Sequence, residues 1–192
     1  MTKEERYGLY SDQKKLLDTF LEHHTISKEQ YKKSFGDLTL KMGMNTPEDV
    51  FIQKTEDISA CLSIRYKVFV EEQKVPIELE KDELDSEGSG CDHFLILKYD
   101  IPVGTFRCYP ESPERIHFQR FCILEEFRGL GLGRLALEFA ERFYKKSGYK
   151  TITLNAQCSA IGFYEKCGFK VTSGIFDDAG IPHRAMIKTI EE

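Results

Sequence analysis

Residues 128–134 carry the clearest chemical signal in the chain, because they read R-G-L-G-L-G-R, with glycines on alternate positions between two arginines. Glycine loses more conformational freedom on folding than any other residue, so its repeated use just before an amphipathic run indicates that the backbone must approach a ligand closely. The free N–H groups and the positive dipole end of a helix start favour an anion. Because guanidinium groups pair with phosphate oxygens, the stretch predicts a phosphate site; the alternative is a flexible turn with solvated arginines.

Two common phosphate-binding loops do not match this stretch. A P-loop reads G-x-x-x-x-G-K-[ST], but Arg134 stands where its second glycine would fall and Leu135 follows. The dinucleotide fingerprint G-x-G-x-x-G also fails, because neither register of the first two glycines supplies a third one. The pattern that remains is R-x-x-G-x-G over residues 128–133.

The elements expected around the loop form a recognisable succession. Residues 118–123 read as a strand before it, and apolar residues at i, i+3 and i+4 spacing predict a helix after it. A short strand near residues 149–157 and a short helix follow, the latter capped by Ser159 and ended by Gly168. With the R-x-x-G-x-G pattern and the closing F-Y-E-K-C-G-F, this succession resembles the second half of the GCN5-related N-acetyltransferases, the GNAT superfamily.

The tail of the chain narrows the resemblance. It reads F-D-D-A-G-I-P-H-R-A-M-I-K, which is similar to the G-I-P-H-x-x-M segment of the small bacterial ElaA/YjcF-like group. The resemblance covers about residues 46–192 and implies acetyl-CoA as the cosubstrate, with no metal. It implies an α+β fold in which a mixed, largely antiparallel central sheet is flanked by helices.

The resemblance assigns a place to each part of acetyl-CoA. The glycine loop would hold the pyrophosphate, and backbone groups of the preceding strand, which splays from its neighbour to open a cleft, would hold the pantetheine arm. Those strand residues would be buried core residues in any case, and Gln157 is a weaker candidate for the cofactor arm. The implied cofactor-binding residues are Phe121, Cys122, Ile123, Arg128, Gly129, Leu130, Gly131, Leu132, Gly133, Arg134 and Asn155.

The reaction needs a neutral amine and a proton for the leaving thiolate. Tyr164 falls where the general-acid tyrosine of the family falls, although it could instead be a tyrosine that only packs at a helix surface. The general base stays open, because Gln119 and Arg120 stand where many members carry a glutamate. His117, His183 and an ordered water are the candidates, since histidine titrates in the useful range.

These features predict the transfer of an acetyl group from acetyl-CoA to a primary amine of a small molecule or peptide. The alternative is a regulatory or interaction protein that binds acyl-CoA without chemistry. The acceptor is expected to be a cation, because acidic side chains crowd the segment after the first predicted helix and would attract it; a solvated acidic loop is the other interpretation. These acidic residues are Glu71, Glu72, Glu78, Glu80, Asp82, Glu83, Asp85 and Glu87.

Residues 1–45 form a unit of their own, in which a helical hairpin is expected ahead of the acetyltransferase domain at residues 46–192. Ser27 and Gln30 form a capping box between its two helices, and residues 45–47 form a break. The hairpin has too little surface to fold alone, so it is expected to pack on the domain or on another copy of the chain as a homodimer.

Bulk composition excludes several classes of protein. A net charge of −5 over 192 residues argues against a nucleic-acid binder. No apolar run approaches the ~18 residues of a membrane span, and the N-terminal stretch lacks an apolar signal core, so a cytoplasmic protein is expected. The six cysteines include no C-x-x-C pair, so they predict packed thiols and no zinc site.

Overall fold

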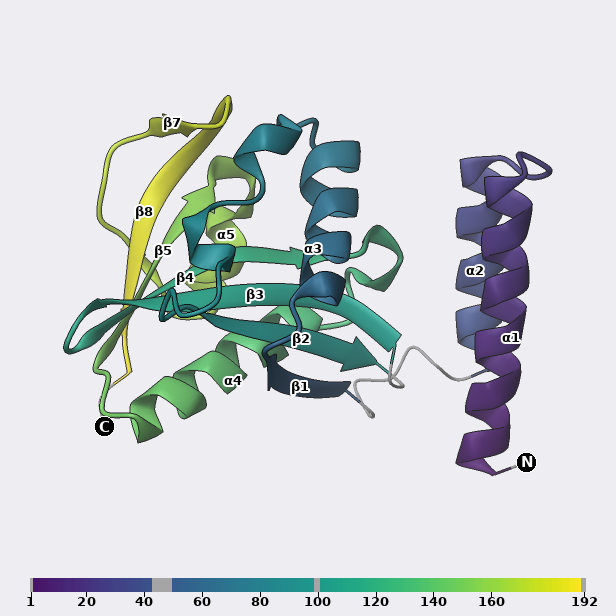
Figure 1. Ribbon diagram of the computed structural model, residues 1–192, viewed down its shortest axis with the longest axis horizontal. Helices are drawn as coiled ribbons and strands as arrows, with labels where there is room; N and C mark the ends of the chain where they lie inside the picture. The colour runs from purple at the N-terminus through teal and green to yellow at the C-terminus, as the bar shows by residue number, and fades with distance from the viewer. Residues whose placement is uncertain (1, 43–49, 99–100, 191–192) are drawn as a thin grey trace.

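The computed structural model describes residues 2–42, 50–98 and 101–190 and is built around one eight-stranded sheet (Figure 1). The strand order is β1-β2-β3-β4-β5-β8-β6, and β7 pairs with β8. The strands are β1 (Val50–Thr55), β2 (Asp92–Lys98), β3 (Ile101–Ser112), β4 (Arg115–Ile123), β5 (Thr151–Gln157), β6 (Lys170–Val171), β7 (Phe176–Asp178) and β8 (Ile181–Thr189). The helices are α1 (Lys3–Glu22), α2 (Lys28–Lys41), α3 (Ser59–Arg65), its π-helical continuation η1 (Tyr66–Glu72), α4 (Leu132–Lys146) and α5 (Ile161–Lys166).

Short 3₁₀-helical turns fill the connections. They are η2 (Ile77–Leu79), η3 (Glu83–Asp85), η4 (Glu125–Phe127) and η5 (Cys158–Ala160). The last of these replaces the predicted start of the short helix: α5 begins after η5 and no side chain caps it, so the prediction that Ser159 caps this helix was wrong. Gly168 follows α5 at a φ of +90°, as a helix-ending glycine should.

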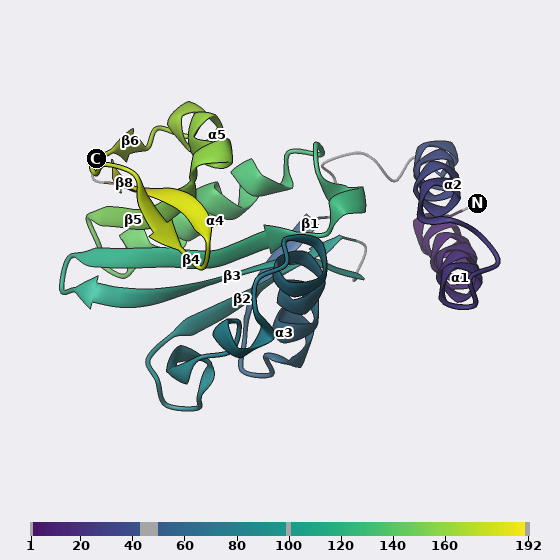
Figure 2. The ribbon, with the colours of Figure 1, turned by 90° about the horizontal axis from the view of Figure 1, so that it is seen from above.

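The alternating pattern of the strands explains why helices cover both faces of the sheet. Phe94 and Ile96 on β2 face the cluster that contains α4, whereas Leu95 between them faces the cluster of α3. Side chains on a strand alternate between faces, so one strand serves two cores. Figure 2 shows α3 on one side of the sheet and α4 on the other. The predicted α+β fold with a mixed, largely antiparallel sheet is confirmed.

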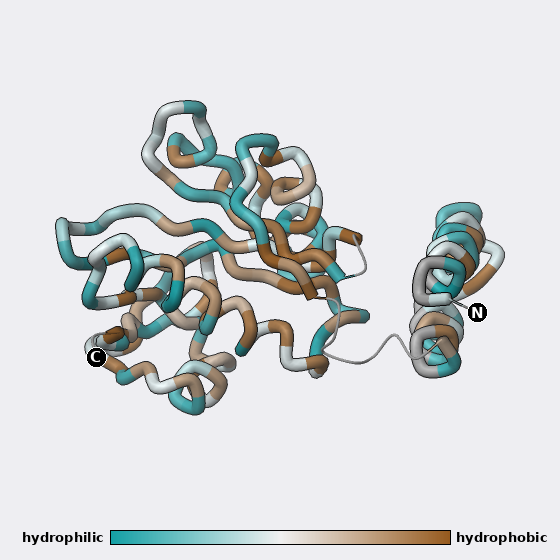
Figure 3. The backbone as a smooth tube through the Cα atoms, turned by 90° about the horizontal axis from the view of Figure 1, so that it is seen from below, coloured by the Kyte–Doolittle hydropathy of each residue, from teal (hydrophilic) through white to brown (hydrophobic). Residues whose placement is uncertain are grey.

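Hydrophobic residues concentrate along the central strands (Figure 3). The ring of Phe106 stacks on those of Phe94 at 4.7 Å and Phe118 at 4.9 Å, one from each neighbouring strand. Cross-strand aromatic pairs of this kind fix the register of the sheet. No helix among the described residues combines the length and the apolar character needed to cross a membrane.

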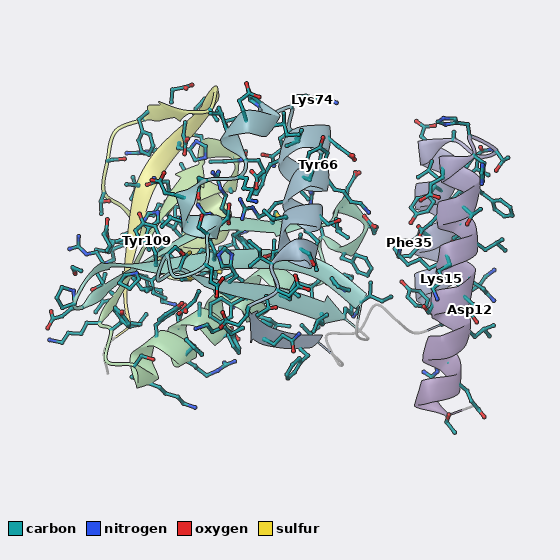
Figure 4. All side chains as sticks on the ribbon, in the orientation of Figure 1. Asp12, Lys15, Phe35, Tyr66, Lys74 and Tyr109 are labelled. Carbon is teal, nitrogen blue, oxygen red and sulfur yellow. The ribbon has the colours of Figure 1, made fainter. Side chains whose placement is uncertain are left out.

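The two N-terminal helices form the expected hairpin. The Ser27 and Gln30 capping box is present, with backbone-to-side-chain hydrogen bonds of 2.8 and 3.1 Å. Phe35 of α2 points toward the domain (Figure 4), and its ring meets that of Phe127 edge-on at 5.6 Å. The hairpin therefore packs beside the start of the glycine loop. The predicted break at residues 45–47, and with it the boundary between the hairpin and the domain, lies outside the described residues.

Candidate functional site

A cleft of about 570 Å³ opens where β4 and β5 separate. The two strands are parallel neighbours, but only residues 115–117 of β4 pair with residues 151–153 of β5. Beyond this point the strands diverge, as the resemblance implied. The predicted site residues that line the cleft are Phe121, Cys122, Ile123, Arg128, Gly129, Gly131, Leu132, Gly133, Arg134, Asn155, Gln157 and Tyr164. Leu130 packs its side chain against the core instead.

A β-bulge in β4 contributes to this divergence. Thr105 of β3 pairs with Cys122, but Arg107 pairs with Gln119, so β4 carries one extra residue over this interval. Arg120 takes up the excess with a φ of 50°, a left-handed conformation that is uncommon outside glycine. Bulges bend a strand and increase its twist, which turns the end of β4 away from β5.

The three glycines of the loop have two different roles. Gly129 and Gly131 adopt φ values of +78° and +79°, and a Cβ on either would meet nothing within 4 Å, so their backbone conformation requires glycine. Gly133 has an ordinary φ, but a Cβ there would come within 2.9 Å of the Phe163 ring. The first two glycines therefore shape the turn that presents the start of α4, while Gly133 allows α4 and α5 to pack closely.

Arg128 does not extend freely from the loop. Its two terminal nitrogens donate to the carboxylate oxygens of Glu72 over 2.6 and 2.7 Å, and its Nε donates to the carbonyl oxygen of Ile123 over 2.9 Å. Hydrogen bonding to Glu72 raises the pKa of the Arg128 guanidinium. A second contact joins the end of η1 to the end of β5, since the side-chain amide nitrogen of Gln157 donates to the amide oxygen of Gln73 over 2.9 Å. No local sequence signal indicates either contact.

Tyr164 serves both the core and the cleft. Only 8% of the residue is exposed, and its ring lies 5.0 Å from that of Phe163 and 5.8 Å from that of Phe169. Burial raises the pKa of its hydroxyl, so the group stays protonated at neutral pH. Within the described part of the chain the hydroxyl has no hydrogen-bond partner, although the residue lines the cleft. The side chain can therefore donate a proton there.

The two histidines proposed as bases lie in different surroundings. His117 lines the cleft, and its Nδ1 lies 2.9 Å from Thr153 Oγ1. His183 is equally buried, but it is not among the residues that line the cleft; its Nδ1 lies 2.8 Å from the carbonyl oxygen of Ile181. The structure brings His117 into the cleft with Tyr164 and leaves His183 outside it.

The acidic segment is partly neutralised by buried arginines. Arg65 binds Asp85 through two hydrogen bonds of 2.6 and 3.0 Å and also pairs with Glu80. Arg107 donates to Asp82 over 2.7 Å and to Asp85 over 2.8 Å. Although burial acts in the opposite direction, the hydrogen bonds from Arg65 hold the pKa of Asp85 below its usual range. Three of the eight acidic residues, Glu80, Asp82 and Asp85, are therefore already paired with arginines of α3 and β3 and anchor the loop to the domain.

The comparisons with known proteins agree with this geometry. Residues 53–190 match the family model described as Acetyltransferase (GNAT) domain. A Bacillus subtilis protein named as an acetyltransferase is 39% identical over 137 residues, which cover 71% of this chain and 92% of that protein. The N-acetyltransferase YjcF of the same organism is 35% identical over 72% of this chain and 97% of its own length.

A solved structure extends the likeness to three dimensions. The crystal structure of Escherichia coli ElaA superposes with a TM-score of 0.62 and 26% identity, covering 72% of this chain and 99% of ElaA. Residues 53–190, which the family model matches, include the glycine loop and the residues that line the cleft, and they begin after the N-terminal hairpin. The chain belongs to the GCN5-related N-acetyltransferase (GNAT) superfamily, in the group that contains ElaA and YjcF.

Proposed function

We propose that this protein transfers the acetyl group of acetyl-CoA to a primary amine, with Tyr164 as the general acid. The observation that carries the proposal is the shared cleft: the glycine loop, the diverging end of β4 and the Tyr164 side chain all line it. Membership of the GNAT superfamily supports the acyltransferase class. The acetyl thioester is the electrophile that acetyl-CoA would supply.

Two parts of the cleft would bind different parts of acetyl-CoA. The N–H groups of the loop and the first turn of α4 would hold the pyrophosphate, because they carry partial positive charge where no intrahelical acceptor competes. The left-handed glycines Gly129 and Gly131 aim these groups. The backbone of Phe121, Cys122 and Ile123 would hold the pantetheine arm, since this part of β4 no longer pairs with β5.

The chemical step follows from the same arrangement. The neutral amine attacks the thioester carbonyl, the C–N bond forms and the C–S bond breaks. The departing thiolate takes the proton of the Tyr164 hydroxyl, which burial keeps protonated. Tyr164 then regains a proton from solvent, and the proton lost by the amine leaves through a base in the cleft.

A cationic acceptor is part of the proposal. The buried ion pairs and the exposed pair of Glu72 with Arg128 leave four exposed carboxylates in the acidic segment, which are Glu71, Glu78, Glu83 and Glu87. Asp178 of β7 adds a carboxylate at the lining of the cleft. Polyamines, aminoglycoside-like compounds and basic peptide ends carry the complementary charge.

Two measurements test the proposed function. Titration calorimetry with acetyl-CoA measures binding, and thiol release with a panel of amines, read together with the mass of the amide product, measures transfer. Binding with amine-dependent thiol release supports the enzyme. Binding with no release for any amine class would instead support a module that binds acyl-CoA without chemistry, and no binding would reject both.

A further inference from the structure

We propose that His117 is the general base that takes the proton from the acceptor amine, and that Thr153 and Glu111 orient it. This inference rests on the proposed function and names the group that the missing glutamate leaves unassigned. His117 and Thr153 are the last pair of β4 and β5 before the strands separate. The imidazole is therefore fixed at the point where the cleft begins, and 8% of the residue remains exposed.

The hydrogen bonds around the ring determine its tautomer. His117 Nδ1 lies 2.9 Å from Thr153 Oγ1, and Thr153 Oγ1 lies 3.0 Å from Glu111 Oε2. An ionised carboxylate only accepts hydrogen bonds, so the single Thr153 O–H proton points to Glu111. The alternative acceptor, the carbonyl oxygen of Ile116, is farther away at 3.4 Å. Thr153 Oγ1 must then accept from His117 Nδ1–H, which leaves the lone pair on Nε2.

The charge state of the ring agrees with this role. Burial lowers the pKa of His117 below its usual 6.5, and the charge of Glu111 acts in the opposite direction. The ring centroids of Tyr109 and His117 are 5.2 Å apart. The charge of Glu111 is itself paired, because Arg115 Nη1 lies 3.8 Å from Glu111 Oε2. The imidazole is therefore neutral at pH 7 and able to accept a proton.

Other charged and polar groups of the cleft are less suited to the task. Arg120 donates to the carbonyl oxygen of Leu79 and to Asp82, and a guanidinium cannot accept a proton. Gln119 carries an amide, which is not a base. Asp178 also lines the cleft but belongs to an exposed part of β7, where it can attract a cation without being held in place.

The proton transfers balance over one turnover. The Nε2 lone pair of His117 takes a proton from the attacking amine as the C–N bond forms. The C–S bond breaks, and Tyr164 gives its proton to the departing thiolate. Protonated His117 and ionised Tyr164 then return to their starting states by exchange with solvent. No oxidant or other co-reactant is needed.

The pH dependence of kcat at saturating amine and acetyl-CoA tests the proposal. The variants are His117→Gln, Glu111→Gln and, as a matched control, His183→Gln, which alters a histidine that is just as buried and lies outside the cleft. We expect the wild type to lose activity as the pH falls through the pKa of His117, because the protonated ring accepts no proton. This fall of kcat at low pH is the acid limb of the pH profile. His117→Gln should lack the acid limb and lower kcat by about 10²–10⁴-fold, while its Kd for acetyl-CoA stays unchanged.

The two other variants separate a catalytic role from a structural one. Glu111→Gln should move the acid limb to lower pH, since Glu111 raises the pKa of His117. His183→Gln should keep the limb of the wild type. An acid limb and a kcat that are unchanged in folded His117→Gln, or a limb that does not move in Glu111→Gln, would overturn the assignment.

Nitrogen-15 NMR of the wild-type histidines gives a readout that does not depend on turnover. The proposal requires His117 to be the Nδ1–H tautomer at pH 7, and the Nε2–H tautomer would overturn it. If the tautomer is Nδ1–H and acetyl-CoA binds, but no amine is acetylated, the proposed function itself is wrong and the role of His117 falls with it.

Discussion

Glu72 and Arg128 lie 56 positions apart in the chain and form a two-pronged ion pair beside the cleft that Arg128 lines, with N···O distances of 2.6 and 2.7 Å. Glu72 ends the π-helix η1, and Arg128 begins the glycine loop. Both side chains are more than a third exposed, and ion pairs of this kind contribute only about 0.2–1 kcal/mol. The pair is therefore weak enough for a phosphate to replace Glu72 as the partner of Arg128.

Substituting Glu72→Gln should tighten acetyl-CoA binding. The change frees the Arg128 guanidinium and removes a negative charge near an anion site, so Kd should fall by up to about fivefold. Titration calorimetry at low salt measures it, with Glu29→Gln on α2 as a control of equal charge change. Weaker binding by Glu72→Gln would mean that Glu72 holds Arg128 in its binding position.

Gly131→Asp should weaken acetyl-CoA binding by at least about tenfold, because it places a carboxylate where the loop would receive phosphate and removes charge-assisted hydrogen bonds. Gly148→Asp is the matched control. Gly148 has a similar φ of +87° at the other end of α4, and a Cβ there also meets nothing within 4 Å. Equal binding by the two variants would reject the loop as the phosphate site.

Tyr164→Phe should lower kcat by about 10²–10⁴-fold and leave the Kd for acetyl-CoA nearly unchanged. The control is Tyr144→Phe, which removes the hydroxyl of another buried tyrosine, one that donates to the partly buried Asp92 over 2.8 Å. Steady-state kinetics on a good acceptor compares the two. A Tyr164→Phe variant with the kcat of the wild type would leave Tyr164 as a packing residue only.

Phe35→Ala should loosen the hairpin from the domain without changing the Kd for acetyl-CoA. Phe35 is 1% exposed, and a buried Phe→Ala change typically removes about 3–5 kcal/mol. Hydrogen exchange of α1 and α2 should therefore rise, whereas Phe20→Ala, at a residue 40% exposed on α1, should change little. Weaker acetyl-CoA binding by folded Phe35→Ala would show that the contact with Phe127 shapes the loop.

The kcat/KM for a cationic amine should fall as salt rises, since the Debye length shortens to about 3 Å at 1 M. The double variant Glu71→Gln with Glu78→Gln should reduce this salt dependence, because both carboxylates are exposed in the acidic segment. A control double variant, Glu22→Gln with Glu29→Gln on the hairpin, should retain it. A kcat/KM that does not change with salt would contradict the proposal that the acceptor is a cation. A neutral or anionic amine as the best acceptor would contradict it as well.

The sequence by itself determined the features that depend on near neighbours. The glycine loop and the helix after it could be predicted because helix starts and apolar spacing involve residues only a few positions apart. The strands also depend on near neighbours, because successive side chains lie on opposite faces of a sheet, as Phe94 and Leu95 do on β2. Tyr164 was predicted from the resemblance carried by its neighbours in F-Y-E-K-C-G-F and does line the cleft; its role as the acid stays a prediction.

Only the tertiary structure decided how distant side chains pair. In the sequence, every carboxylate of the acidic segment could attract a cationic acceptor. In the structure, Asp82 and Asp85 accept hydrogen bonds from Arg107, whose position on β3 depends on the register of the sheet. His117 and His183 were both candidates for the base, and the sequence placed His183 near the expected acceptor cleft. In the structure, β4 and β5 diverge beyond His117, so His117 lines the cleft and His183 does not. These outcomes depend on contacts between residues tens of positions apart, and local periodicity carries no information about which distant partner a buried charge will meet.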